Sequence, residues 1–484
     1  MTDDGAGQVD GHGDGQGAGH GRGTADLIVV NAGLVITMDR TRRVLRGAGI
    51  AVGNGRIIAI GPVDELAGAH HDVTTLDADG GWIIPGLIDA HQHLTGDRLA
   101  RCSIPDDLAS GDAIIEWALP LHRAHDGDDD ELSATLACVE AVRNGVTTII
   151  EAGTVAHPDR VANAAQRVGV RVGLGRWGWD VGDGPHVAPV ADVVARAAAL
   201  LDQFPPHGDG LVRGWVALVG HDLMSDELVV AATTLARERH AQITYHLSPT
   251  DADGRAYVAR TGRRPVVHLD ALGVLGPEVL LAHALHIDDA ELGALVAHDV
   301  AVAACPWAYL RLGQGMSGAA RYVELVGRGG RLALGCDSEN AGDQIDVLRA
   351  AALFAGMAKD AMADPTQPGA HLALELATIR GAAAIGRADD LGSIEVGKRA
   401  DLVVVDTRRP EWQPAGTDPA LQLVWGTDGR SVRHVVVDGR VVVRDGACTG
   451  VDESALADAV GDASTSLARR AGVTRQSRWP ISPA

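Results

Sequence analysis

The chain has 484 residues, of which 46% are hydrophobic and 22% are charged, and these values exclude a fibrous or wholly disordered protein. Asp and Glu number 64 against 42 Lys and Arg, which leaves a formal net charge of −22. That charge argues against nucleic acid and anionic membranes as partners, so we expect a small-molecule partner.

The cysteines and the apolar runs bear on the cellular compartment. The five cysteines are scattered and never form a CxxC pair, which argues against a disulfide framework or a thiolate zinc site. No run approaches the roughly 18 consecutive apolar residues of a membrane span, and the N-terminus lacks the layout of a secretory signal. We therefore predict a cytoplasmic protein. The cysteines are Cys102, Cys138, Cys305, Cys336 and Cys448.

Residues 1–25 differ in composition from the rest of the chain. Nine glycines occur within the first 24 residues, among Asp, Gln and His and with almost no apolar side chains. Such a segment cannot bury enough surface to offset the entropy lost on ordering, so we predict a disordered tail.

Short β-type runs follow at both ends of the remaining chain. Leu27–Ile36 and Gly49–Ile60 come first, and an Asn-Gly hairpin signal interrupts the second run. Ala400–Asp406 and Val432–Arg444 repeat the pattern, the latter with an Asp-Gly turn between two valine-rich strands. Each pair of runs is too small for a core of its own.

The two β-rich pieces are therefore predicted to join into one small composite β-sandwich. We assign residues 26–84 to its first part and residues 391–450 to its second part. Residues 451–484 are predicted to form a C-terminal helix and tail.

Between these pieces, residues 85–390 alternate apolar strand-like runs with Ala- and Leu-rich stretches of helical period, which predicts βα units around a parallel sheet. Eight such runs over about 250 residues match a (β/α)8 TIM barrel, whose active sites lie at the carboxyl ends of the strands. The eight runs are Trp82–His93, Gly145–Gly153, Val168–Trp177, Leu211–His221, Gln242–Ser248, Val279–His286, Val300–Trp307 and Arg331–Asp337.

The first of these runs ends with two histidines, His91 and His93. Residues two apart in an extended chain point to the same side, so both imidazoles face one point. Two converging imidazole nitrogens suit a divalent metal ion, whereas two buried histidines without a partner would each carry an unsatisfied polar edge. A pair of hydrogen-bonded core histidines is the alternative.

Three later runs also finish with a residue that can bind a metal or accept a proton. These are His246, His283 and Asp337, on the fifth, sixth and eighth strands. Taken singly, each histidine is equally compatible with a structural role, and an Asp after a strand is more often a helix cap. Their coincidence at the same ends of one barrel favours a shared site.

These residues resemble the amidohydrolase superfamily, in particular its cytosine deaminase and s-triazine hydrolase branch. The resemblance extends from residue 26 to about residue 450 and is carried by Ile84–His93, Gly145–Thr148 and Gly392–Leu402. It implies that His91, His93 and His246 bind a metal ion together with Asp337. It also implies that His283 contacts the bound water or the developing oxyanion.

The number of lysines bears on the number of metal ions. Binuclear members of this superfamily commonly bridge two ions with a carbamylated lysine at the end of strand four, but the only lysines here are Lys359 and Lys398. We therefore predict one ion per subunit. Glu151, at the end of the second strand, could bridge in principle, although a local hydrogen bond or ion pair is favoured. Zinc fits the ligands best, and Fe, Co or Mn accept the same donors.

A single zinc ion can lower the pKa of bound water to about 7 and so provide hydroxide at neutral pH. Asp337 would accept the proton of the attacking water and pass it to the departing amine. His283 would stabilise the tetrahedral oxyanion. The expected outcome is hydrolysis of a carbon–nitrogen bond.

The chain departs from this branch on strand five, where deaminases carry His-x-x-Glu and the Glu protonates a ring nitrogen. Here the run is His246-Leu247-Ser248-Pro249, and proline cannot transfer a proton. Either another acid serves, with Asp251 and His221 as candidates, or the substrate has no ring nitrogen that needs a proton. Asp251 is equally compatible with a turn.

Other residues are candidates for the substrate pocket. His221 ends strand four, where it would face the pocket mouth. Arg176, Trp177 and Trp179 follow strand three and could line a substrate slot or pack at its rim. Asn340 follows Asp337 and could contact substrate, although capping of the next helix explains it equally well.

The leading functional hypothesis is a metal-dependent hydrolase of a non-peptide carbon–nitrogen bond in an amide, urea, carbamate or amidine. The alternative is a deaminase of an aminated heterocycle of triazine, purine, pyrimidine or pterin type. A non-catalytic scaffold is less favoured, because such scaffolds typically lack the metal ligands that this chain retains. The resemblance also implies a homo-oligomer.

Overall fold

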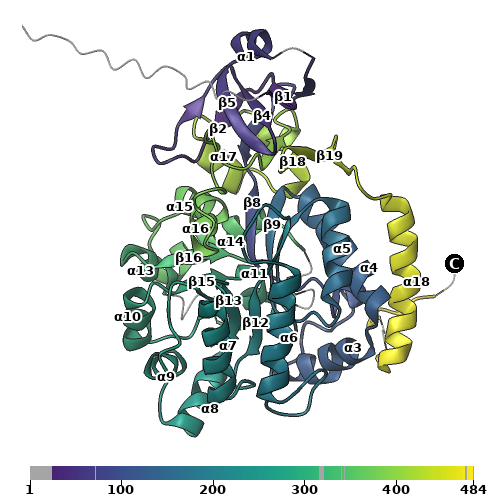
Figure 1. Cartoon of the computed structure of the whole chain (residues 1–484), viewed down its shortest axis with the longest axis vertical. Helices are drawn as coiled ribbons and strands as arrows, with labels where there is room; N and C mark the ends of the chain where they lie inside the picture. Colours follow the sequence, from purple (N-terminus) through teal and green to yellow (C-terminus); the bar gives the residue numbers. More distant parts are fainter. Residues whose placement is uncertain are drawn as a thin grey trace, which may run out of the picture.

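The computed structural model describes residues 24–70, 72–315, 321–338, 341–342, 344–474 and 477–482. Most of the predicted tail and the candidate residue Asn340 lie outside these residues. Figure 1 shows a smaller β-rich part at one end of the molecule, a larger α/β part below it, and the C-terminal helix along one side.

The β-rich part contains two sheets, and both are built from β-branched runs. The first sheet has the order β5-β4-β1-β6 and the second has the order β20-β19-β18-β17-β7-β2-β3. The strands of the first sheet are β1 (Leu27–Val30), β4 (Ala48–Gly53), β5 (Arg56–Pro62) and β6 (Thr74–Asp77). Those of the second are β2 (Leu34–Ile36), β3 (Val44–Leu45), β7 (Trp82–Pro85), β17 (Leu402–Val405), β18 (Val432–Val437), β19 (Arg440–Arg444) and β20 (Ala447–Cys448).

The second sheet joins the two ends of the chain, because β17 pairs antiparallel with β7. Apolar side chains from both sheets, including Val29, Ile50, Val404 and Val436, are fully or almost fully buried in one common cluster. The joining of the two β-rich pieces is therefore confirmed.

Both hairpin predictions in this part are also confirmed. Asn54 and Gly55 have φ angles of 51° and 73°, and Asp438 and Gly439 have φ angles of 51° and 77°. Positive φ at both central residues is the signature of the type I′ turn that matches strand twist.

Two predicted runs are each divided between two sheets, contrary to the expectation of single strands. Leu27–Ile36 divides into β1 and β2, because Asn31 adopts a φ of 56° and a side chain at Gly33 would collide with the backbone of Gly80. Trp82–His93 divides in the same way at Gly86, where a side chain would collide with Thr147. These close approaches depend on partners distant in sequence.

The larger part contains two parallel sheets, in the orders β11-β10-β9-β8 and β12-β13-β14-β15-β16. Each of the eight predicted runs contains a strand, and the fourth run is interrupted at Trp215. The strands are β8 (Leu87–Gln92), β9 (Val146–Glu151), β10 (Arg171–Leu174), β11 (Val212–Gly214), β12 (Val216–Gly220), β13 (Ile243–Leu247), β14 (Val279–His283), β15 (Ala301–Ala304) and β16 (Arg331–Leu334).

The two parallel sheets are linked at both of their edges. Trp215 connects β11 directly to β12, and its backbone N–H donates to the carbonyl of Leu174, 2.8 Å away. At the other edge, the Asp337 N–H donates to the His91 carbonyl at 2.9 Å, so the carboxyl ends of β8 and β16 lie side by side.

Helices alternate with these strands and cover the sheets (Figure 1). Two of them begin with reciprocal capping boxes, formed by Asp126 with Asp129 and by Asp288 with Glu291, which satisfy otherwise free backbone N–H groups. The helices are α4 (Gly127–Arg143), α5 (Pro158–Val168), α6 (Val190–Gln203), α7 (Asp226–Glu238), α8 (Asp251–Thr261), α9 (Pro265–Ala271), α10 (Asp289–Ala297), α11 (Pro306–Arg311), α13 (Tyr322–Gly327), α14 (Val347–Met362), α15 (Ala370–Ala377) and α16 (Ile379–Ala384).

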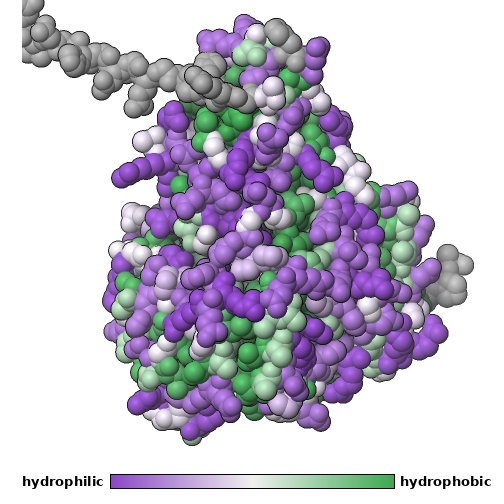
Figure 2. Space-filling model, viewed as in Figure 1, coloured by the Kyte–Doolittle hydropathy of each residue, from purple (hydrophilic) through white to green (hydrophobic). Residues whose placement is uncertain are grey.

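The remaining elements are short, except for the C-terminal helix. They are α1 (Val63–Ala69), η1 (Arg98–Ala100), α2 (Ser110–Ala113), the π-helical turn η2 (Ile114–Ala118), α3 (Leu119–Ala124), η3 (Pro410–Trp412), α17 (Pro419–Trp425), η4 (Gly429–Ser431) and α18 (Glu453–Ala471). None of the helices among the described residues combines the length and apolar character needed to span a bilayer. Figure 2 shows hydrophilic side chains over most of the face it presents.

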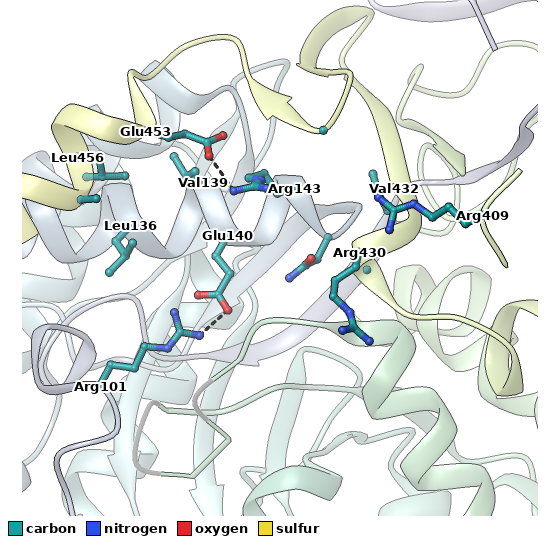
Figure 3. A pocket seen from close by; sticks show the side chains of 14 residues that line it. Arg101, Leu136, Val139, Glu140, Arg143, Arg409, Arg430, Val432, Glu453 and Leu456 are labelled. Atoms are coloured by element: carbon teal, nitrogen blue, oxygen red, sulfur yellow. Dashed lines mark hydrogen bonds and ion pairs between the residues drawn. The ribbon is translucent and has the colours of Figure 1, made fainter. Parts of the chain in front are cut away.

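The C-terminal helix α18 packs beside α4 and α3, where Leu467 is buried against Leu99 and Leu121. A cavity of about 470 Å³ lies where α4, α18 and the second sheet meet, as Figure 3 shows. Two of its arginines are ion-paired there, Arg143 with Glu453 at 2.7 Å and Arg101 with Glu140 at 2.6 Å. These pairs connect elements and are compatible with a structural role.

Candidate active site

Five predicted site residues meet at the carboxyl ends of the parallel strands. His91 lies in β8 with His93 just beyond it, His246 lies in β13, His283 ends β14, and Asp337 follows β16. Ligand atoms of His91, His93, His246 and Asp337 all lie within 4.8 Å of one another. The side chains predicted to share a site are therefore brought together.

Hydrogen bonds determine which nitrogen of two imidazoles faces this cluster. The Nδ1–H of His246 donates to the carbonyl of Val219 at 2.7 Å. The Nδ1–H of His93 donates to the hydroxyl of Thr154 at 2.9 Å, and that hydroxyl donates to Glu151. In its neutral form, each ring therefore presents an unprotonated Nε2 to the cluster. Burial lowers the pKa of His93, but the neighbouring Asp337 outweighs this effect and raises it.

The two Nε2 atoms of His93 and His246 are 3.2 Å apart. Two lone pairs at that separation repel each other unless an electrophile lies between them. Nitrogens bound to one tetrahedral zinc ion at 2.0–2.1 Å are separated by roughly 3.3 Å. The donor arrangement therefore fits a divalent metal ion.

His91 gives a second, independent indication of the same fit. It is almost fully buried, and neither ring nitrogen has a hydrogen-bond partner within the protein. Its Nε2 lies 3.7 Å from Oδ1 of Asp337. Burial lowers the pKa of His91 and lowers the pKa of His246 well below its usual value, so both rings are held in the neutral form that binds metals.

Two buried carboxyl groups next to the cluster fix the backbone that carries it. Asp89 is fully buried, and its Oδ1 accepts the backbone N–H groups of His91 at 3.2 Å and Cys336 at 3.1 Å. Glu151 accepts the N–H of Gly153 at 2.7 Å. Burial raises the pKa of each of these carboxyl groups to about 7.

Asp337 and His283 lie side by side, with His283 Nε2 3.9 Å from Asp337 Oδ2. Burial raises the pKa of Asp337, but the close imidazoles of His91 and His93 outweigh this effect and hold the pKa well below its usual value. Burial also lowers the pKa of His283 to about 3. A carboxylate therefore faces a neutral imidazole.

A tyrosine pair determines the tautomer of His283. The Tyr322 hydroxyl donates to the His283 carbonyl at 2.7 Å, so the hydroxyl of Tyr309, 2.9 Å away, donates to Tyr322. Tyr309 can then only accept from His283 Nδ1, which lies 3.4 Å away. The Nδ1 of His283 therefore carries the proton, and Nε2 presents a lone pair to Asp337 and the cavity.

Three of the predicted site residues have a left-handed backbone. The φ angles are 54° at His221, 76° at His283 and 69° at Asp337. Such conformations are unfavourable for residues other than glycine, and they persist where surrounding bonds over-determine them, which is frequent at functional sites.

The cluster opens into a cavity of about 460 Å³, in the range of small-molecule sites. Apolar side chains form most of its walls, and polar side chains of the cluster also line it. Its lining includes His93, Asp97, Ile114, Leu119, His122, Thr154, Trp177, Trp179, His221, His246, Pro249, Asp253, His283, Leu312 and Asp337.

The other predicted substrate residues divide into two groups. His221, Trp177 and Trp179 line the cavity, whereas Arg176 is not among its lining residues. Asp251 is also outside the lining, because its largely exposed carboxylate pairs with Arg255 on the outer side of α8.

The aspartate of α8 that lines the cavity is Asp253, two residues after the predicted Asp251. Its Oδ2 accepts the Ser248 N–H at 2.6 Å, and its Oδ1 lies 3.5 Å from Nδ1 of His221. One helical turn later, the Tyr257 hydroxyl donates to the His221 carbonyl at 2.8 Å. A helix that begins at Asp251 places residues 253 and 257 on one face, and this helical periodicity is the sequence signal that could have identified Asp253.

His122 is the second residue that the sequence analysis did not single out. It lines the cavity from α3 and packs edge to face against Trp177, with ring centroids 4.9 Å apart. No local motif marks it, because α3 reaches the cavity only through its packing against Gly96 and α18.

Comparison with known proteins agrees with this geometry. The model of the amidohydrolase family matches residues 82–442. A 5-methylthioadenosine/S-adenosylhomocysteine deaminase of Syntrophobacter fumaroxidans is 32% identical over 87% of this chain and 93% of its own length. A 5'-deoxyadenosine deaminase of Methanothermobacter thermautotrophicus is 30% identical over 78% of this chain and 86% of its own length.

Two solved structures are similar over nearly their whole length. An adenosine deaminase from Xanthomonas campestris with bound zinc superposes with a TM-score of 0.86 at 26% identity, covering 92% of this chain and 99% of that one. An atrazine chlorohydrolase from Arthrobacter aurescens in complex with zinc superposes with a TM-score of 0.81 at 25% identity, covering 91% and 99%.

Proposed function

We propose a function from the premise that this chain belongs to the amidohydrolase family, which its family match and its relatives establish. It is an enzyme that hydrolyses carbon–nitrogen bonds other than peptide bonds. Of the two reactions considered from the sequence, the relatives favour deamination of an aminated heterocycle over hydrolysis of an amide or urea. The observation that carries the proposal is the cluster of four metal donors at the end of a cavity of about 460 Å³.

The substrate class that we propose is an adenosine-type nucleoside with an exocyclic amino group. The relatives are named for substrates of this class. The indoles of Trp177 and Trp179 line the cavity wall and offer apolar faces to a planar base. The cavity size is compatible with a nucleoside.

His91, His93, His246 and Asp337 would hold one divalent ion, with zinc favoured by the nitrogen-rich donor set. When bound, such an ion supplies a water of lowered pKa and an electrophilic centre. Cys305 forms a second group with His283 and Asp337, but burial and nearby carboxylates raise its thiol pKa well above its usual value. Because this second group shares Asp337 with the first, and because no lysine is available to bridge two ions, we retain one ion per subunit.

Three side chains of the protein orient the attacking water and move its proton. His283 Nε2 accepts a hydrogen bond from the attacking water and so orients it towards the base. Asp337 accepts the proton of that water and delivers it to the departing amine. Tyr309 keeps the proton of His283 on Nδ1 and so keeps Nε2 available.

We assign the proton for the ring nitrogen to the pair formed by His221 and Asp253, which takes the place of the Glu that is replaced by Pro249. Both side chains line the cavity beside His246, and His221 is stacked on that ring with centroids 5.2 Å apart. The carboxylate of Asp253 orients His221 and balances its charge when it is protonated.

The variants Asp253→Asn and Asp251→Asn form a matched pair that tests this assignment. We expect kcat/KM with adenosine-type substrates to fall by about 10²-fold for Asp253→Asn, because a positioned acid contributes about that much. Asp251→Asn is expected to stay near the parent, since Asp251 lies outside the cavity. Equal activities in the two variants would remove Asp253 from the mechanism.

The finer features of architecture are also proposals. We propose that the two linked parallel sheets form one (β/α)8 barrel over residues 85–390, and that residues 26–84 and 391–450 form the β-sandwich. A homo-oligomer located in the cytoplasm, without nucleic acid or membrane partners, completes the proposal.

A substrate panel tests the function as a whole. The zinc-loaded enzyme is supplied with adenosine, 5'-deoxyadenosine and 5'-methylthioadenosine, and with simple amides and ureas as the contrasting set. We expect release of ammonia and conversion of the 6-amino group to a 6-oxo group. Turnover confined to the amides and ureas would reject deamination in favour of the other carbon–nitrogen reaction.

A further inference from the structure

A much smaller cavity lies at the amino ends of the parallel strands, away from the metal donors. Its volume is about 60 Å³. Its lining comes from the starts of neighbouring strands and from the segment that follows α16. The polar and aromatic residues that line it are Thr148, Arg171, His207, Arg213, Trp215, His240, Gln242 and Arg387.

Four of these residues carry a buried polar atom without a hydrogen-bond partner in the protein. The atoms are Oγ1 of Thr148, Nη1 of Arg171, Nε of Arg213 and Oε1 of Gln242. Strand pairing brings three of the residues together, because Arg171 is opposite Thr148 and Arg213 is opposite Gly173. An unsatisfied buried polar group destabilises the folded state, so four around one cavity indicate a bound partner.

The charges around this cavity are one-sided. Three guanidinium groups line it, and the described lining residues include neither Asp nor Glu. Arg171 directs its Nε and Nη2 to Asp401 at 2.9 and 3.0 Å. Arg387 binds Asp390 through two nitrogens, at 2.8 and 2.6 Å. The acidic partners therefore lie behind the arginines, and the cavity itself is positive.

Arg213 is the least compensated of the three. Its Nη2 donates to the carbonyl of Gly208 and lies 4.0 Å from Asp390, the nearest carboxylate paired with it. Burial, together with the charges of Arg387 and Arg171, lowers the pKa of Arg213 to about 10. Its side chain is only 14% exposed, so solvent screens this charge poorly.

We propose that this cavity binds one small inorganic anion of halide size, held by the guanidinium N–H groups of Arg171 and Arg213 and the hydroxyl of Thr148. The cavity of about 60 Å³ is large enough for a halide and far smaller than the cavity of about 460 Å³ beside the metal donors, so a nucleotide does not fit. Water alone would satisfy the polar atoms but would leave Arg213, whose paired carboxylate is 4.0 Å away, without a close counter-charge. The anion joins β9, β10 and β11 and acts on stability, separately from the proposed catalysis.

Crystallography with bromide is the direct test. Crystals of the full chain are soaked in bromide, and anomalous scattering is measured at the bromine absorption edge. The proposal expects an anomalous peak within hydrogen-bond distance of Arg171, Arg213 and Thr148. Density at that position that refines as water without an anomalous signal would overturn it.

Thermal unfolding provides the test in solution. The midpoint of the full-length protein is measured in sodium chloride and in sodium gluconate at equal ionic strength. We expect chloride to raise the midpoint by about 2–4 °C, because an anion that binds only the folded state stabilises it. Equal midpoints in the two salts would overturn the proposal.

Variants localise the chloride effect. Arg213→Gln removes a charge. Thr148→Val removes a hydroxyl but keeps the side-chain shape, and it serves as the test if Arg213→Gln does not fold. Both are expected to lose the chloride-dependent shift. Arg196→Gln, on the exposed side of α6, is the matched control and is expected to keep it. A full shift in Thr148→Val and Arg213→Gln would contradict the assigned site.

Discussion

The two ends of the parallel strands carry opposite kinds of polar chemistry. At the carboxyl ends, His93, His246, His283 and Asp337 face a cavity of about 460 Å³. At the amino ends, three arginines face a cavity of about 60 Å³, and aspartates from other elements pair with them from behind. The first set presents unsatisfied lone pairs, whereas the second presents paired charges and unsatisfied N–H groups.

The two ends of the strands therefore have different roles: the carboxyl ends carry the proposed chemistry, and the amino ends contribute to stability. Neutral imidazoles without protein partners are costly to the fold and useful to a bound cation. Arginines bound to aspartates connect strands to the C-terminal segment, as Arg171 does with the buried Asp401 and the partly exposed Asp438. In (β/α)8 barrels, the architecture proposed above for residues 85–390, active sites occupy the carboxyl ends and the opposite face serves stability.

The strongest test of this separation is Asp337→Asn. The variant loses the carboxylate that accepts the proton, and we expect kcat/KM to fall by about 10³-fold or more while the unfolding midpoint changes little. Steady-state kinetics, zinc analysis and circular dichroism measure the three quantities. Activity near that of the parent would show that another group accepts the proton.

The reciprocal test at the other end is Arg171→Met. Arg171 and Asp401 have side chains only 2% and 5% exposed, so removal of the arginine leaves an unpaired buried carboxylate. We expect the free energy of unfolding to fall by about 3–5 kcal/mol, with kcat of the folded fraction unchanged.

Denaturant titration together with active-site counting measures these effects. Arg430→Met is the control, because the exposed Arg430–Asp428 pair is expected to leave the midpoint near that of the parent. A loss of kcat in folded Arg171→Met would contradict the separation of the two ends.

A smaller effect is expected from Thr154→Val, which interrupts the hydrogen bonds that link His93 to Glu151. Loss of such an outer contact typically weakens metal binding by about 10–100-fold. Competition with a chelator measures the affinity for zinc, and activity should return when excess zinc is added. Thr234→Val, on the exposed side of α7, serves as the control. Unchanged zinc affinity would show that Thr154 does not position His93.

Much of the architecture could be predicted from local patterns. The alternation of apolar runs and helical stretches located all eight parallel runs, because burial on both faces makes such strands continuously apolar. The Asn-Gly and Asp-Gly pairs located two hairpins, because few other residues tolerate their turn geometry. The divisions at Gly33 and Gly86 could not be located, since they depend on Gly80 and Thr147.

The candidate site divides in the same way. His91, His93, His246, His283 and Asp337 could be identified because each stands at the end of an apolar run, where the fold class directs chemistry. Asp253 and His122 could not, because one face of α8 and the packing of α3 bring them to the cavity. Arg176 and Asp251 stand near strand ends in sequence, yet neither lines the cavity.

The order of residues along the chain thus determined which side chains end the strands, since side-chain alternation and strand length are local properties. The packing of distant segments decided the remainder: which nitrogen of each histidine faces the cluster, which aspartate reaches His221, and that three arginines enclose a cavity. These outcomes depend on hydrogen bonds between residues far apart in sequence, and no short window of residues contains both partners.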